Sequence, residues 1–106
     1  MYERDVVVVA ADPFGNTPRR PYLIVSNAAH PFAGRQYIAL GITTKEYVAS
    51  IPLEGAFETG SLDRESFVSP WAVVSLQDID VDRAIARVST ELTDTAVDQM
   101  TQYVFD

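Results

Sequence analysis

The sequence DVVVVAA, residues 5–11, is a run of mostly β-branched residues of strand length. Such a run is typical of a strand that is buried on both faces. A second apolar segment, YLIVS at residues 22–26, follows a loop rich in turn formers at residues 12–18. Pro21 can open a strand but cannot sit centrally in one. The two segments therefore predict two strands joined by a loop.

The rest of the chain predicts more short strands and then one helix. Asn27 to Gly34 is expected to be a loop, and residues 54–64, which are polar and hold two glycines, a surface connection. Pro70 is expected to separate two short strands. The predicted strands are residues 36–42, 47–53, 66–69, 71–76 and 84–88, with a helix or helix-to-strand transition as the alternative for the last.

The C-terminal segment has a different pattern. Thr93 is a good N-cap, and Asp94 follows it where the helix dipole favours a negative charge. Apolar residues then recur at helical spacing: Ala96, Val97, Met100, Tyr103 and Val104. The sequence therefore predicts a mainly β protein, a small barrel or strongly curved sheet plugged by a C-terminal amphipathic helix.

Length and composition set limits on the class of protein. A chain of 106 residues and 11.7 kDa is expected to form one domain, residues 1–106. No apolar run approaches the ~20 residues of a membrane span, and three charged residues, Glu3 to Asp5, interrupt any signal peptide. We therefore expect a cytoplasmic protein with no membrane contact. The absence of cysteine excludes disulfides, thiolate zinc sites and a cysteine nucleophile.

The charge is acidic and unevenly distributed. Residues 1–50 carry five basic and four acidic side chains, whereas residues 51–106 carry three and eleven, which gives a net charge of −7. A surface that binds nucleic acid is therefore expected in the N-terminal half. The single lysine against seven arginines is typical of proteins that work in molar salt, but an ordinary acidic protein from a GC-rich genome has the same composition. Composition leaves both sources open.

Metal and triad chemistry have little support. Asp78, Asp80 and Asp82 could converge on a hard cation, but they lack the glycine and terminal glutamate of a calcium loop, so a solvated acidic turn is the alternative. His30, the only histidine, lies in a loop without nearby carboxylates and is expected to be a surface residue rather than the base of a triad. No glycine-rich phosphate loop occurs.

Two polar features could bind a phosphate. Arg19 and Arg20 lie at a junction between loop and strand, and arginine offers a rigid fork of donors that matches a phosphate. Thr43 and Thr44 directly follow the third predicted strand. Taken alone, the arginines are more often a solvated pair beside a proline, and the threonines are more often ordinary residues at a strand end.

The same residues carry a resemblance to the PemK/MazF/Kid toxin family. That family opens with a GDV-like strand, a loop that ends in Arg-Pro and a strand of the type LVVSN. The matching parts of this chain cover nearly its whole length in order: residues 5–9, Asp12-Pro13, Gly15, residues 20–27, residues 38–44, residues 71–74, residues 77–80 and residues 92–94.

The resemblance implies an SH3-like barrel that forms a homodimer and acts as the toxin of a type II toxin–antitoxin pair. Most members are endoribonucleases that cut single-stranded RNA at specific sequences without a metal or other cofactor. Attack of the ribose 2′-hydroxyl would leave a 2′,3′-cyclic phosphate and a free 5′-hydroxyl. The family's catalytic arginine and threonine fall on Arg20 and Thr43. Around them, the residues expected to bind RNA are Phe14, Asn16, Thr17, Arg19, Thr44 and Lys45.

Arg20 would stabilise charge on the phosphoryl oxygens, and the Thr43 hydroxyl would hold the scissile phosphate. Bases of single-stranded RNA also stack on aromatic rings, and Phe14, Tyr22 and Phe32 lie in or beside loops where bases could lie. For each of the three, packing is the more common role. Two positions depart from the family pattern. The loop before Arg20 has no acidic residue after Asp12, and residues 75–78 contain no arginine. A related barrel that binds RNA or a protein without cutting is therefore the alternative function.

Overall fold

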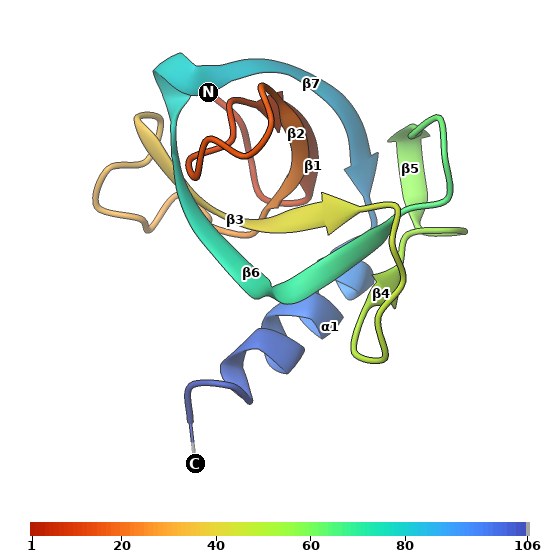
Figure 1. The fold of residues 1–106 in the computed structure, drawn as a ribbon. Coiled ribbons are helices and arrows are strands. Elements are labelled where there is room, and N and C mark those ends of the chain that lie inside the picture. Colours follow the sequence, from red (N-terminus) through yellow and green to blue (C-terminus); the bar gives the residue numbers. More distant parts are fainter. Residues whose placement is uncertain (106) are drawn as a thin grey trace.

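The computed structural model describes residues 1–105, which form a curled antiparallel sheet followed by one helix (Figure 1). The seven strands pair in the order β4-β6-β3-β2-β1-β7-β5. The mainly β, barrel-like prediction is confirmed. The elements are β1 (Val6–Ala10), β2 (Arg20–Ile24), β3 (Gln36–Thr43), β4 (Ile51–Pro52), β5 (Phe57–Gly60), β6 (Phe67–Gln77), a 3₁₀ turn (Asp78–Asp80), β7 (Val81–Val88) and α1 (Thr90–Thr101).

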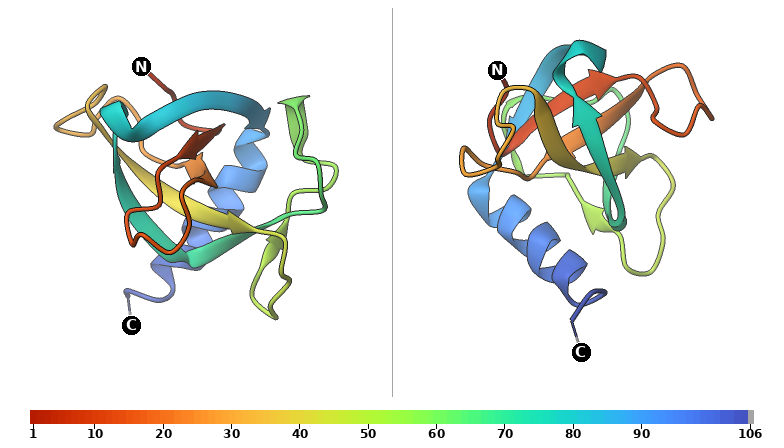
Figure 2. Two further views of the ribbon diagram at one scale, coloured as in Figure 1. Left: turned by 45° about the horizontal axis from the view of Figure 1, so that its top comes forward. Right: turned by 90° about the vertical axis from the view of Figure 1, so that its left-hand side faces the viewer.

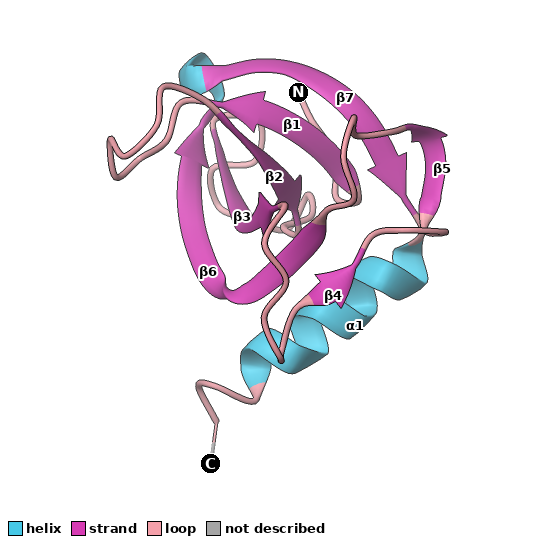
Figure 3. Cartoon of the chain, turned by 45° about the vertical axis from the view of Figure 1, so that its right-hand side comes forward, coloured by secondary structure: helices cyan, strands magenta, loops and turns pink. Residues whose placement is uncertain are grey.

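Two apolar clusters cover the two faces of the central strands. Alternate residues of each strand go to opposite clusters, as the two-residue period of a strand requires. A helix-side cluster joins the sheet to α1, which lies along the outside of the curled sheet beside β6 (Figure 3). Its buried members include Val7, Leu23, Leu40, Ile42, Val68, Leu92 and Ala96. An inner cluster contains Val8, Ala10, Tyr22, Ile24, Tyr37, Ala39, Val74 and Leu76. The unbroken apolar runs in the sequence thus correspond to strands buried on both faces.

A bulge bends β6 and closes the sheet. The prediction that Pro70 separates two strands is wrong, because β6 runs through it from Phe67 to Gln77. Ser69 pairs with Gly41 and Val73 with Leu40, so three residues of β6 lie opposite a single step of β3. Bulge residues leave the ladder and bend the strand. Pro70 sits within this bulge, where its missing N–H breaks no ladder hydrogen bond.

Two other strand predictions need correction. The strand expected at residues 47–53 is reduced to Ile51–Pro52, because residues before it form a turn in which the N–H of Ser50 donates to the carbonyl of Tyr47. The connection expected at residues 54–64 contains β5, which pairs with β7 at one edge of the sheet. β5 is mostly exposed, so no apolar pattern marks it.

The helix begins earlier than predicted. Ser89 is the N-cap, and its hydroxyl accepts a hydrogen bond from the N–H of Leu92. Thr93, the predicted cap, lies inside the helix and is fully buried. The helix ends at Thr101, so Tyr103 and Val104 lie beyond it and are exposed. Of the predicted apolar stripe, Ala96 is buried and Met100 packs against the helix-side cluster.

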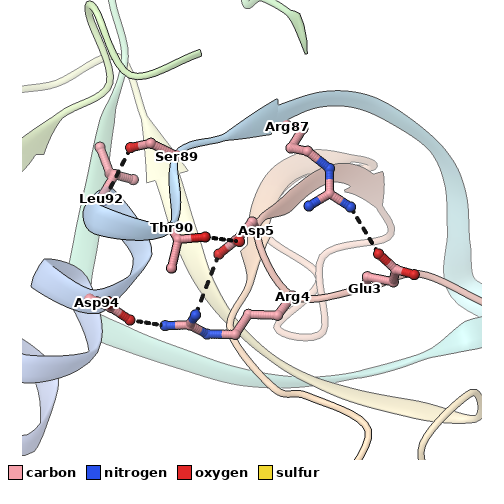
Figure 4. A network of polar contacts seen from close by, with 8 residues as sticks. All are labelled: Glu3, Arg4, Asp5, Arg87, Ser89, Thr90, Leu92 and Asp94. Atoms are coloured by element: carbon pink, nitrogen blue, oxygen red, sulfur yellow. Dashed lines mark hydrogen bonds and ion pairs between the residues drawn. The ribbon is translucent and has the colours of Figure 1, made fainter. Parts of the chain in front are cut away.

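Polar contacts tie the N-terminus to the start of α1 (Figure 4). Asp5 is buried at φ 81°, and its carboxylate accepts a hydrogen bond of 2.9 Å from the Thr90 hydroxyl. The guanidinium of Arg4 pairs with Asp94, one turn further into the helix. The N–H of Asp5 donates to the carbonyl of Ile24. A carboxylate near a helix N-terminus is favourable, so this network holds the helix against β1 and β2.

No helix of the described residues is long and apolar enough to cross a membrane.

Leu40→Ala tests the packing between β3 and α1. Leu40 is fully buried in the helix-side cluster, so its truncation is expected to cost about 2–5 kcal/mol of unfolding free energy. Chemical denaturation measures this change. Ile79→Ala is the control, because Ile79 is 87% exposed and its truncation should cost less than about 0.5 kcal/mol. Equal effects of the two substitutions would contradict the assignment of the core.

Candidate functional site

The antiparallel pairing of β2 with β3 puts the two predicted catalytic residues at one end of the sheet. Tyr22 pairs with Gly41 in this antiparallel hairpin. Arg20 and Thr43 each lie two residues beyond this last pair of the ladder, at the first position of β2 and the last position of β3, so both belong to the same end of the hairpin. Arg20 shares the parity of Tyr22, so both side chains lie on the face of the inner cluster. Both residues are half-buried at the strand ends.

The two neighbouring arginines differ in their partners. Arg19 is exposed and its guanidinium lies 3.4 Å from a carboxylate oxygen of Asp82. Arg20 forms no ion pair with any carboxylate of residues 1–105. Since a guanidinium stays charged at any working pH, Arg20 supplies a positive charge whose donors are available to a ligand.

Asp12 shapes the loop between β1 and β2. Its buried carboxylate accepts hydrogen bonds from the backbone N–H groups of Phe14 (2.9 Å), Asn16 (3.1 Å) and Thr17 (3.2 Å). The Phe14 N–H is the main cause of the lowered pKa of Asp12, against the opposing effect of burial, and the charge of Arg20 lowers this pKa further. The loop therefore turns around one ionised side chain.

Tyr22 lies beneath Arg20 as part of the inner cluster. It is 2% exposed, and burial, followed by the negative charge of Asp12, raises the pKa of its phenol. The charge of Arg20 acts in the opposite direction. Tyr22 is thus a packing residue. Although it was a candidate for base stacking, it has no accessible ring face.

The remaining predicted RNA-binding residues lie on two loops at the same end of the sheet. Figure 2 (right) shows the β1–β2 and β3–β4 loops projecting from one side and the β2–β3 loop from the opposite side. The first loop exposes Phe14, Asn16, Thr17 and Arg19, and the second exposes Thr44 and Lys45. The Thr43 hydroxyl accepts a hydrogen bond of 3.2 Å from the N–H of Lys45.

The opposite end of the sheet holds His30 and Phe32. The Nδ1 of His30 accepts a hydrogen bond of 2.9 Å from the Phe32 N–H, so this histidine shapes its own loop. A strand the length of β3 separates this end from Thr43 by roughly 20 Å. A cavity of about 380 Å³ also lies at this end, lined by residues of the N-terminus, of the β2–β3 loop and of β3, among them Tyr2, Arg4, Asn27 and Tyr37.

The acidic turn after β6 has partners of its own. Asp78 accepts a hydrogen bond of 2.6 Å from the Tyr37 hydroxyl, and Asp82 pairs with Arg19 and Arg83. Within residues 1–105, no three histidine, cysteine or acidic side chains form a group that could hold a metal ion.

An aromatic pair beside the site was missed by the sequence analysis. The rings of Tyr47 and Trp71 meet edge to face, with centroids 5.7 Å apart, and both are nearly half exposed. The Lys45 ammonium lies 5.2 Å from the Tyr47 ring centroid. The two aromatic residues are far apart in sequence, so only the pairing of β3 with β6 brings them together.

Comparison with solved structures shows which known fold this is. An endoribonuclease in complex with its cognate antitoxin, from Mycobacterial species, superimposes with a TM-score of 0.74 at 16% identity, covering 97% of this chain and 92% of that one. The chain has the fold of the MazF toxins. The Mycobacterium tuberculosis toxin MazF-mt6 gives a TM-score of 0.75 at 16% identity over 95% and 98% of the two chains.

A MazE-MazF complex from Deinococcus radiodurans gives a TM-score of 0.73 at 18% identity, over 97% of this chain and 94% of that one. No protein-family model matches the sequence, and no curated protein matches it. The MazF fold is therefore established by structural likeness, at identities too low to transfer an activity.

Asp12→Ala tests how the β1–β2 loop is held. We expect faster hydrogen exchange at the amides of Phe14, Asn16 and Thr17, because each loses its acceptor. In the unchanged protein the folded pKa of Asp12 lies below 3.8, so its stabilising effect is present above that pH and is lost as the pH falls through the folded pKa. The protection factors of these amides, in which the intrinsic pH dependence of exchange is divided out, should fall with pH in the unchanged protein and show no such step in Asp12→Ala. Identical exchange in both proteins would refute the role of Asp12.

Proposed function

We propose that this chain is a toxin of the MazF-like family and cuts single-stranded RNA at specific sequences without a metal ion. The observation that carries the proposal is that Arg20, which has no carboxylate partner among residues 1–105, lies at the same end of the β2–β3 hairpin as Thr43. The fold supports it, because similar structures are described as endoribonucleases. The sequence resemblance supports it independently, since the family's arginine and threonine fall on these two positions.

The reaction uses only groups of the RNA and of the protein. The ribose 2′-oxygen bonds to the neighbouring phosphorus as the bond from phosphorus to the 5′-oxygen breaks. The 2′-hydroxyl loses a proton and the departing 5′-oxygen gains one, which leaves a 2′,3′-cyclic phosphate and a 5′-hydroxyl. Negative charge grows on the non-bridging oxygens in the transition state. The fork of Arg20 matches two of these oxygens, and the Thr43 hydroxyl donates to the phosphate from the facing strand.

The two loops beside the site are proposed to hold the RNA strand. Phe14, Asn16 and Thr17 project from a loop that Asp12 fixes in shape, so little order is lost on binding. Arg19 binds an RNA phosphate after it releases its exposed partner Asp82. This exchange costs little, because a surface ion pair contributes at most about 1 kcal/mol. Thr44 and Lys45 bind from the second loop.

A second copy of the chain and a cognate antitoxin are the proposed protein partners, in the cytoplasm. Ile38 and Val73 are exposed apolar residues on neighbouring strands, β3 and β6, and support a homodimer. A MazE-MazF complex and an endoribonuclease bound to its antitoxin are among the similar structures, which supports an antitoxin partner.

One observation favours a barrel that binds RNA or a protein without cutting it. Asp12 is a carboxylate whose pKa is lowered by the charge of Arg20, and it already accepts hydrogen bonds from three backbone N–H groups. A carboxylate held ionised in this way is a poor candidate for the general base. The alternative predicts RNA binding with no cleavage products.

Arg20→Ala is the direct test of the proposed activity. The chain should cut a long RNA in the presence of a chelator and leave 5′-hydroxyl and 2′,3′-cyclic phosphate ends. Loss of the guanidinium should lower kcat by about 10²–10³-fold, because it removes a donor that stabilises the transition state. Single-turnover cleavage of a labelled RNA measures this change.

Arg35→Ala is the matched control. Arg35 is an exposed arginine directly before β3, at the opposite end of the hairpin from Arg20. Its carbonyl, which accepts from the N–H of Asp78, is kept in the variant. The cleavage rate of this variant should stay within about twofold of that of the unchanged protein. A twofold change is too small to reflect the loss of an interaction with the transition state. RNA left intact at every salt concentration would refute the nuclease and favour the binding-only barrel.

A further inference from the structure

The aromatic pair of Tyr47 and Trp71 is left exposed by the fold. The two residues are 46% and 44% exposed, and their rings meet at an interplanar angle of 87°. In an edge-to-face pair, the ring that contributes its edge keeps both of its faces free of that contact. Large aromatic rings that stay in water in this way are costly, and they are enriched where a protein binds a partner.

The pair flanks β3, the strand that ends in Thr43. Tyr47 follows Thr43 by four residues, and the loop between them is anchored by the hydrogen bond from the Lys45 N–H to the Thr43 hydroxyl. Trp71 lies in the bulge of β6, whose next residue, Ala72, packs directly against Gly41. Gly41 is two residues from Thr43 on the same strand. A nucleotide next to the scissile phosphate would therefore lie within reach of these rings.

The charge at this position suits a nucleic acid. Lys45 is the only lysine of the chain, and among residues 1–105 it forms no ion pair. Its ammonium instead lies over the Tyr47 ring, 5.2 Å from the centroid. An acidic protein of net charge −7 thus keeps an unpaired cation beside two aromatic rings. A ring for a base and a cation for its phosphate are the two elements by which proteins bind single-stranded RNA.

We propose that Tyr47, Trp71 and Lys45 form a base-stacking platform that holds an RNA nucleotide flanking the scissile phosphate. This inference rests on the proposed nuclease function and adds to it a binding position for one base. Stacking tolerates every base, because each has a π-face, so the platform contributes affinity and position rather than sequence choice. Lys45 binds the phosphate of the stacked nucleotide.

The test uses the fluorescence of Trp71, the only tryptophan of the chain. The full-length protein is titrated with a single-stranded, 2′-O-methylated 20-nucleotide pool of random sequence, which cannot be cut because the attacking hydroxyl is blocked. We expect RNA to quench the emission of Trp71. Unchanged emission at saturating RNA, with binding confirmed by anisotropy of a labelled pool, would overturn the proposal.

Substitutions separate the parts of the platform. Tyr47→Ala and Trp71→Ala should each weaken binding about 5- to 100-fold, which corresponds to the loss of stacking on one base. Lys45→Gln should lower the slope of log affinity against log salt concentration by about 0.7, the value for one phosphate contact on a single strand. Phe32→Ala is the matched control, because Phe32 is similarly exposed but lies at the opposite end of the sheet. The affinity of this variant for RNA should not change. Thermal melts of all four variants should match that of the unchanged protein.

The outcomes also distinguish this inference from the proposed function. In a cleavage assay the platform variants should raise KM and leave kcat nearly unchanged. Cleavage with unaltered KM in Tyr47→Ala and Trp71→Ala would overturn the platform alone. RNA binding that depends on these residues, with no cleavage under any condition, would overturn the nuclease alone. Trp71 protected from acrylamide in the free protein would show that a second copy covers the platform, and would overturn it.

Discussion

The antiparallel register between β2 and β3 is the constraint on which the site depends. Side chains of a strand alternate between faces, so a slip of one residue would move Arg20 to the face that packs against α1. Leu23 pairs with Leu40, and both are fully buried in the helix-side cluster. This pairing prevents such a slip, because the slip would remove leucine side chains from that cluster. The chemistry proposed at the strand ends is therefore a consequence of packing in the middle of the hairpin.

The electrostatics of the site follow from which charges already have partners. Asp12 is satisfied by backbone N–H groups of its own loop, so it shapes the loop without neutralising Arg20. Arg19 is paired on the surface with Asp82, whereas Arg20 and Lys45 have no carboxylate partner within residues 1–105. The chain has nearly twice as many acidic as basic residues. A polyanion is therefore attracted to the end of the sheet where these two cations have no carboxylate partner.

Local patterns predicted the parts of the molecule that are determined locally. The apolar runs predicted β1, with its burial on both faces, and β2, and the resemblance selected Arg20 at the start of one strand and Thr43 at the end of the next. The path of β6 through Pro70 could not be predicted, because a bulge depends on the pairing of β6 with β3. β5 has no apolar pattern since it is an exposed edge strand, and Ser89 could not be preferred to Thr93 as the helix cap without the packing of α1. Trp71 and Tyr47 meet only through the same long-range pairing.

A double-mutant cycle between Arg20 and Thr43 tests the central claim most directly. The claim is that both side chains act on one phosphate. Cleavage rates would be measured for Arg20→Ala, Thr43→Val and the double variant. If the two residues act as a unit, the double variant should be only slightly slower than the worse single variant. Rate losses that multiply in the double variant would show that the two residues act independently, and would contradict the account.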